Sequence, residues 1–141
     1  MSLVQMSNIS SIGMHAFENC SSLISIDLPY AELMGNNAFS NCYSLLSINC
    51  DNVKRIDTNT FYNCYSLSSL NLPELSTLKS MIGQFTYCSS LTGMYCPNVL
   101  CLDFNSSYLT AYAFTGCDNL ISIYIDNDNI KSIDNGYDNP N

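Results

Sequence analysis

The chain has 141 residues, of which 47% are hydrophobic and only 11% are charged, and its formal net charge at pH 7 is −8. Its four Lys and Arg residues argue against binding to nucleic acid or to anionic membrane surfaces, because both need basic patches. No apolar run approaches the roughly 20 residues of a membrane-spanning helix, so we expect no membrane insertion. The polar surface must instead be built from Ser, Asn, Thr and Tyr.

One sequence unit recurs along nearly the whole chain, and Ala38–Asn49 (AFSNCYSLLSIN) is a clear copy of it. Its phenylalanines are separated by steps of 22, 22, 24 and 29 residues and lie at Phe17, Phe39, Phe61, Phe85 and Phe114. A period of about 20–30 residues is typical of a solenoid, in which each repeat forms one rung of a coil.

The chain opens half-way through a rung, since Met1–Ile12 aligns without gaps to Leu23–Met34. Each rung then contains the spacing L-x-x-I-x-L, whose last three positions alternate as in a short strand with one face inward. These strands are expected within residues 23–28, 45–50, 67–72, 91–96 and 120–125. Proline closes three of them, because it cannot donate the next hydrogen bond between strands.

A second pair of apolar residues, three positions apart, follows each strand. The pairs are Ala31/Met34, Val53/Ile56, Leu75/Leu78, Val99/Leu102 and Ile130/Ile133. The segment A-F-x-x-C then turns the chain back, with Phe and Cys pointing inward. Stacked rungs bury each other's apolar side at about 4.8 Å per rung, so six strand copies span roughly 25 Å.

The register A-F-x-x-C-x-x-L-x-x-I-x-[LI]-P, followed by V-x-x-I as in Val53–Ile56, resembles the BspA-like leucine-rich repeat family. The resemblance covers residues 1–133 and departs from the pattern at two insertions, around 79–84 and 103–112. It implies a right-handed leucine-rich-repeat solenoid of about five to six rungs, with a parallel sheet on one face and short turns opposite. We expect one repeat domain over residues 1–133 and a C-terminal tail over 134–141.

The family resemblance also implies a surface adhesin or protein-binding module, and it brings no catalytic residues. Localisation at the cell surface or outside the cell follows from the resemblance alone, because Met1–Met6 lacks the features of a secretory signal.

Five of the eight cysteines occupy the same rung position, in phase with the core Phe and Leu, and are Cys20, Cys42, Cys64, Cys88 and Cys117. We therefore expect a ladder of buried, reduced thiols rather than disulfides. A metal site is disfavoured because no C-x-x-C is present and the chain has one histidine, His15, which we expect in an exposed turn. Neither a nucleophile with its base nor a glycine-rich phosphate loop is evident, so we predict no enzyme activity and no cofactor.

The outward side of the strand stack is the candidate binding surface. On each strand the residues flanking the central apolar position point to solvent, which gives a column of mainly serines beside a column that runs Gln, Asp, Asn, Asn, Tyr, Tyr. Tyrosine combines apolar area with a hydroxyl group and suits interfaces. The predicted partner-binding residues are Ser25, Asp27, Asn49, Asn71, Tyr95 and Tyr124, and the partner is an unidentified protein; a solvated face without a partner is the alternative.

Two functions remain open from the sequence. One is an interaction or adhesion module that binds through this face. The other is a structural subunit of a filament or particle, in which rung ends and faces are buried against neighbours, since an unpaired strand edge favours self-association.

Overall fold

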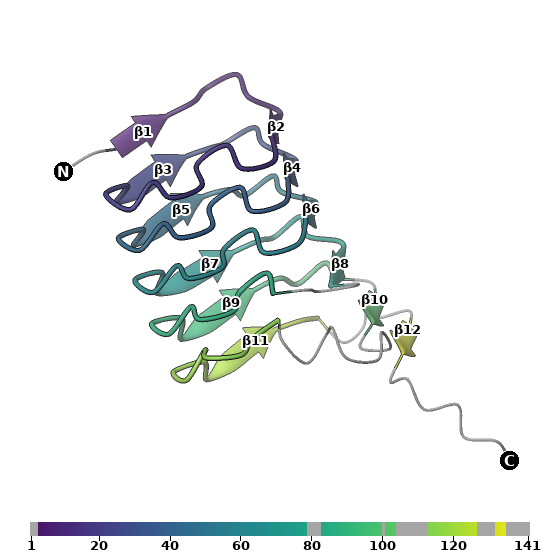
Figure 1. The fold of residues 1–141 in the computed structure, drawn as a ribbon. Helices are drawn as coiled ribbons and strands as arrows, with labels where there is room; N and C mark the ends of the chain where they lie inside the picture. The colour runs from purple at the N-terminus through teal and green to yellow at the C-terminus, as the bar shows by residue number, and fades with distance from the viewer. Residues whose placement is uncertain (1–2, 79–82, 100, 104–112, 127–131, 135–141) are drawn as a thin grey trace, which may run out of the picture.

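The computed structural model describes residues 3–78, 83–99, 101–103, 113–126 and 132–134, and in this part of the chain it contains strands and no helix (Figure 1). The strands form two columns. The first column consists of β1 (Leu3–Gln5), β3 (Ser25–Asp27), β5 (Ser47–Asn49), β7 (Ser69–Asn71), β9 (Gly93–Tyr95) and β11 (Ser122–Tyr124). The second consists of β2 (Ser11–Ile12), β4 (Leu33–Met34), β6 (Arg55–Ile56), β8 (Thr77–Leu78), β10 (Cys101–Asp103) and β12 (Ser132–Asp134).

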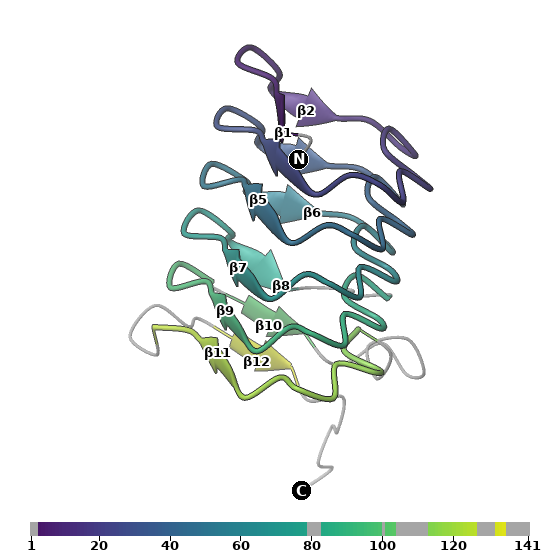
Figure 2. The same ribbon diagram turned by 90° about the vertical axis from the view of Figure 1, so that its left-hand side faces the viewer.

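Every strand pairing is parallel and joins equivalent positions of successive rungs. Ile26 lies between Val4 and Ile48 in the first column, and Met34 lies between Ile12 and Ile56 in the second. The two columns lie on different sides of the coil, and the chain runs from one to the other within each rung (Figures 1 and 2). The second column coincides with the apolar pairs of the sequence, so a segment with only two inward positions also forms short strands.

The first column is divided into two sheets, because strand pairing stops between β5 and β7 among the described residues. The sheets have the orders β1-β3-β5 and β11-β9-β7. Elsewhere the amide after a strand donates to the next rung, as Leu28 N does to Asn49 O at 2.9 Å and Leu72 N to Tyr95 O at 2.8 Å. At the division, the thiol of Cys50 approaches the Asn71 carbonyl oxygen at 3.8 Å. The predicted parallel sheet is therefore present, but as two three-stranded parts.

The turns that contain phenylalanine form a third hydrogen-bonded side of the coil. The amide of Phe17 donates to the carbonyl of Ala38, and the equivalent bonds continue to the last of these turns, where Phe85 N donates to Ala113 O. The residue two positions after each phenylalanine has a positive φ, a conformation that asparagine and glycine adopt most readily. These residues are Asn19, Asn41, Asn63, Tyr87 and Gly116.

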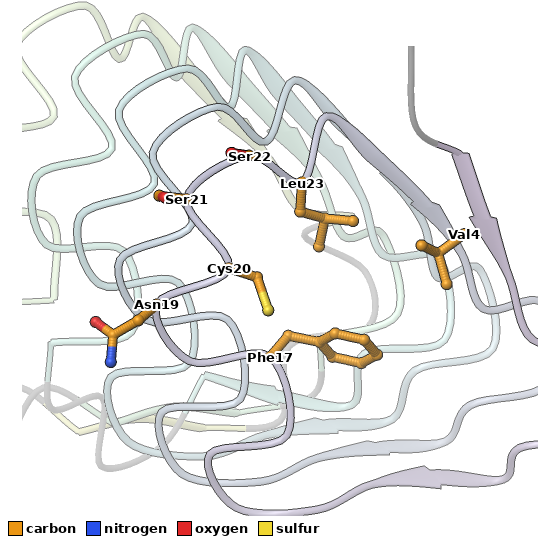
Figure 3. A pocket seen from close by; sticks show the side chains of 7 residues that line it. All are labelled: Val4, Phe17, Asn19, Cys20, Ser21, Ser22 and Leu23. Atoms are coloured by element: carbon orange, nitrogen blue, oxygen red, sulfur yellow. The ribbon is translucent and has the colours of Figure 1, made fainter.

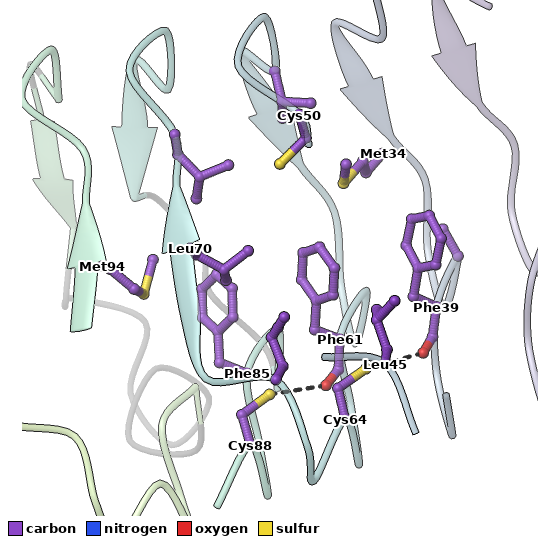
Figure 4. Packing of buried hydrophobic residues seen from close by; sticks show 14 of the residues in the cluster. Met34, Phe39, Leu45, Cys50, Phe61, Cys64, Leu70, Phe85, Cys88 and Met94 are labelled. Carbon is purple, nitrogen blue, oxygen red and sulfur yellow. Dashed lines mark hydrogen bonds between the residues drawn. The ribbon is translucent and has the colours of Figure 1, made fainter. Parts of the chain in front are cut away.

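The core is a stack of phenylalanine rings inside the coil. Successive rings are 5.1, 5.6, 5.9 and 5.3 Å apart between centroids and lie within 15° of parallel. Phe39, Phe61 and Phe85 are fully buried (Figure 4). Phe17 and Phe114, at the two ends of the stack, are partly buried. The four stacked pairs confirm that the phenylalanines are equivalent by translation along one coil.

The predicted solenoid is thus confirmed, with one small difference in length. The stack from Phe17 to Phe114 makes four complete circuits, with part of a rung on either side, so the expected five to six rungs slightly exceeds the number of complete turns. The insertions expected around 79–84 and 103–112 lie mostly outside the described residues, as does the tail after Asp134. Strand β12 includes Asp134, and the domain limit at 133 stays a prediction.

Candidate functional site

The strand face consists of the outward residues of the first column. As alternation requires, the central residue of each strand points inward and its two neighbours point to solvent; Ile26, Leu70 and Met94 are 2–3% exposed. The six residues predicted for binding all lie on this face. Asn49, Asn71, Tyr95 and Tyr124 are exposed, and Ser25 and Asp27 are partly exposed.

On the N-terminal half of the strand face, formed by β1, β3 and β5, two outward polar residues bond to one another. The amide of Asn49 donates to the carboxylate of Asp27 with an Nδ2–Oδ1 distance of 2.6 Å. This hydrogen bond between rungs fixes the two groups relative to one another. With Ser25, Ser47, Asp27 and Asn49 facing outward, this half of the face is a polar surface.

The C-terminal half of the strand face, formed by β7, β9 and β11, is aromatic. The rings of Tyr95 and Tyr124 stack with centroids 5.1 Å apart and planes 15° apart, yet the two residues remain 46% and 54% exposed. A hollow of about 390 Å³ lies beside them, lined by Ser69, Leu70, Asn71, Thr92, Gly93, Met94, Tyr95, Ser122 and Tyr124. We call it the tyrosine hollow.

The tyrosine hollow brings together three of the six predicted residues, Asn71, Tyr95 and Tyr124. The other three, Ser25, Asp27 and Asn49, lie on the N-terminal half and do not line it. Sequence reasoning did not select Thr92 or the open space at Gly93. The sequence did contain one indication of the hollow: Gly93 stands at a position where four of the other five rungs have serine.

Two exposed apolar residues beside the strand face were also missed. Leu46 is 53% exposed and Ile121 is 86% exposed. Both immediately precede a strand, β5 and β11, at the position that Ser68 and Thr92 occupy in the rungs between them. The repeat pattern could have identified these two positions, one beside each half of the face.

The cysteine ladder is a structural feature of the core. Seven of the eight cysteines, Cys20, Cys42, Cys50, Cys64, Cys88, Cys96 and Cys117, are free, and all of these except Cys20 are buried. Four thiols donate to the carbonyl of the phenylalanine in the preceding rung, as Cys64 Sγ does to Phe39 O at 3.2 Å and Cys88 Sγ to Phe61 O at 3.2 Å (Figure 4). This confirms the predicted ladder of buried thiols.

Burial suppresses the reactivity of most of these thiols. Removal from water raises the pKa of Cys42 to about 12 and the pKa of Cys96 to about 11. At Cys88, interaction with the neighbouring Cys117 thiol and burial raise the pKa, whereas interaction with Cys88 lowers the pKa of Cys117. Because the thiolate is the reactive form, a buried thiol with a raised pKa is a poor nucleophile and metal ligand.

The described residues also bear on the expectations for the histidine, for a metal site and for a membrane span. His15 is exposed in a turn, as predicted, and its Nδ1 lies 2.8 Å from Glu18 Oε2. In the same part of the chain there is no group of three or more His, Cys, Asp or Glu residues that could hold a metal ion. Nor is any helix found there with the length and apolar character needed to cross a membrane.

A second hollow, of about 480 Å³, lies at the N-terminal end of the coil and is lined by core-type residues, among them Val4, Phe17, Cys20 and Leu23 (Figure 3). In the close-up, the Phe17 ring, the Cys20 thiol and the Leu23 side chain extend from one rung toward the interior of the coil. Phe17 and Cys20 are only partly buried, unlike their equivalents Phe39 and Cys42.

The family model described as BspA type leucine-rich repeat region (6 copies) matches residues 2–107 and 82–137 of the chain. No curated protein matches. Two similar solved structures are a leucine-rich cell surface protein from Faecalibacterium prausnitzii and a leucine-rich repeat protein from T. pallidum.

The first structure is 25% identical with a TM-score of 0.70, and the match covers 87% of this chain but 31% of that one. The second is 22% identical with a TM-score of 0.57, and the match covers 86% of this chain and 68% of that one. The second likeness concerns the fold alone. The parallel coil, the repeated Phe and Cys register and the family match agree: the chain belongs to the BspA-type leucine-rich repeat family.

Proposed function

We propose that the chain is a non-enzymatic interaction or adhesion module that binds a protein partner through the outward side of its first strand column. The main observation behind the proposal is the exposed Tyr95–Tyr124 pair beside the tyrosine hollow. The family is generally non-catalytic, and a similar solved structure is described as a cell surface protein, which supports display at the cell surface.

The physical argument rests on exposure and rigidity. Tyrosine is enriched in interfaces because it contributes a large contact area while losing little side-chain entropy. Here the two rings are held by each other and by strand pairing, with Tyr124 in register with Tyr95. Asp27 and Asn49, which are tied by their hydrogen bond, extend the same face with polar groups, as in the rim of an interface.

The test compares capture of partners by two matched variants. The triple variant Asp27→Ala/Tyr95→Ala/Tyr124→Ala alters the strand face. The control Tyr43→Ala/Tyr65→Ala removes another exposed stacked pair, with centroids 5.4 Å apart, that precedes the strands and lies outside the outward columns. Each protein is immobilised and exposed to a surface-protein extract of the source cells, and captured proteins are quantified by mass spectrometry.

We expect a protein retained by the native chain and by the control to be lost from the triple variant. Equal retention by all three proteins would contradict binding through the strand face. Equal loss from both variants would contradict it too, provided that both remain folded by circular dichroism.

A structural subunit is the second candidate, and the hollow at the N-terminal end favours it. Val4 and Phe17 present partly exposed apolar surface there, which another chain could cover. We expect a structural subunit to associate as concentration rises in light scattering after size exclusion, and Val4→Glu to prevent this. A native chain that stays monomeric at all concentrations would contradict this candidate and leave the interaction module.

A further inference from the structure

We propose that the tyrosine hollow binds a neutral carbohydrate, with a sugar ring stacked on the outer face of Tyr95 and its hydroxyl groups bonded to the surrounding side chains. This rests on the proposed function and deepens it, because both use the Tyr95–Tyr124 pair: the sugar is a glycan carried by the protein partner.

Tyr124 covers one face of the Tyr95 ring, and Asn71 is the next residue on the other side of the column. The second, outer face of the ring is left open, since Tyr95 is 46% exposed although Tyr124 stacks on it. Asn71 donates its amide to the carboxylate of Asp51 at 2.8 Å, on the rung away from Tyr95. The amide of Asn71 is thereby directed away from the Tyr95 ring.

Gly93 opens the floor of the same hollow. In four of the other five rungs a serine side chain occupies this position, whereas Gly93 leaves a notch between Ser69 and Ser122. A Cβ atom at Gly93 would meet Ser122 Oγ at 3.5 Å, an ordinary contact, so neither its backbone nor its packing demands glycine. The missing side chain therefore enlarges the hollow without being required by the fold.

The lining of the hollow is neutral, although the chain carries a net charge of −8. None of the nine lining residues is Asp, Glu, Lys or Arg. No lining residue could form an ion pair with a charged ligand. The hollow is therefore better suited to an uncharged ligand.

The polar groups of the hollow match hydroxyl groups. Ser69, Ser122 and the two tyrosines carry hydroxyls, each of which can both donate and accept a hydrogen bond. A sugar presents the same dual groups around its edge, and the C–H bonds on its face pack against an aromatic ring. The combination of one open ring face and several hydroxyls is therefore complementary to a sugar residue.

A neutral proline-rich peptide is the competing occupant, since such peptides dock on exposed tyrosines. The backbone of such a peptide has mainly carbonyl groups, which accept hydrogen bonds. The hydroxyls of the hollow could donate to these carbonyls, but they would have no donor from which to accept. Addition of a peptide strand is also disfavoured here, because β9 is paired on both sides, with β7 and β11. The hydroxyl-rich lining therefore favours the carbohydrate.

The experiment titrates the native chain with cellohexaose, maltohexaose, N-acetylchitohexaose and a decaproline peptide, using calorimetry and saturation-transfer NMR. We expect at least one hexasaccharide to bind and decaproline not to bind. Tyr95→Ala should weaken the binding at least about tenfold, whereas Tyr95→Phe, which keeps the ring, should weaken it less than Tyr95→Ala does. Gly93→Leu should abolish binding by filling the notch.

The controls are Tyr43→Ala and Ser47→Leu, which place the same changes outside the hollow, the second at the position equivalent to Gly93 on β5. Absence of binding by all three sugars, binding of decaproline instead, or equal loss in the control variants would overturn the proposal. Failure here is distinct from failure of the proposed function, because the protein-capture test uses a different readout and includes Asp27, which lies outside the hollow.

Discussion

The two halves of the strand face have the same backbone and opposite surface chemistry. In the N-terminal half the repeats are 22 residues apart, and polar side chains continue from rung to rung. Asn49 donates to Asp27 on the strands, and in the turns Asn41 and Asn63 form a ladder that begins at Asn19, with distances of 2.9 and 2.8 Å. In the C-terminal half the steps are 24 and 29 residues, and the same columns contain aromatic residues and glycine.

The turns of the C-terminal half show how this difference is accommodated. Tyr87 and Gly116 replace asparagine at the ladder position, both with positive φ. The ring of Tyr87 lies where a side chain at Gly116 would begin. A large residue on one rung is thus matched by the absence of a side chain on the next, whereas asparagines can repeat because each amide bonds to its neighbour. The comparison indicates that regular repeats maintain the coil and that the irregular ones form the tyrosine hollow, the surface proposed for binding.

The largest expected effect on stability comes from a variant of the phenylalanine stack, which tests whether one continuous core lies beneath both halves of the strand face. Phe61 is fully buried between Phe39 and Phe85, close to the division between β5 and β7. We expect Phe61→Ala to lower the free energy of unfolding by about 3–5 kcal/mol in urea titrations, because it leaves a cavity in the stack. The matched change Phe114→Ala, at a partly buried position, should cost clearly less. Equal losses would mean that the stack is not a continuous core.

An intermediate effect on stability is expected when the asparagine ladder of the turns, Asn19, Asn41 and Asn63, is extended into the C-terminal half. Gly116→Asn alone should lower stability by about 1–3 kcal/mol, because the new side chain overlaps with the Tyr87 ring. In a Tyr87→Asn background the same change should be nearly neutral, since asparagine tolerates positive φ. The amide introduced at position 116 can then donate to the one introduced at position 87, as Asn63 donates to Asn41. A double-mutant cycle by urea unfolding measures this coupling. If the two changes are simply additive, the proposed matching of Tyr87 with Gly116 is wrong.

Sequence periodicity was sufficient to predict the coil, the strands of its first column and the inward Phe and Cys positions. These features depend on positions that repeat in phase, and one sequence displays the phase several times. The strands of the second column were not predicted, because those in the first rungs have only two residues and show only an apolar pair in the sequence.

The site was only partly predictable for a different reason. Alternation placed Asn71, Tyr95 and Tyr124 on the outward face, but it does not say which neighbour a side-chain amide will bond to. The hollow depends on Asn71 bonding to Asp51 and on the space left at Gly93, and both are properties of tertiary packing. The break between β5 and β7 likewise could not be predicted from the repeat. Cys50 replaces the leucine of the neighbouring rungs at the break, but Cys96 replaces it too, where β9 and β11 remain paired.

The smallest effect concerns the polar contacts of the N-terminal half. Asn49→Asp replaces the amide that bonds to Asp27 by a second carboxylate, and both groups lie at the surface. We expect it to be about 0.5–1 kcal/mol less stable than Asn49→Ala at low salt, because the new charge repels Asp27, and the difference should vanish in about 1 M salt. The counterpart in the other half, Tyr95→Phe, keeps the stacked pair and should alter stability by less than about 0.5 kcal/mol at either salt concentration. A difference between Asn49→Asp and Asn49→Ala that persists at high salt would show that the contact is not electrostatic. The two halves would then differ in packing as well as in charge.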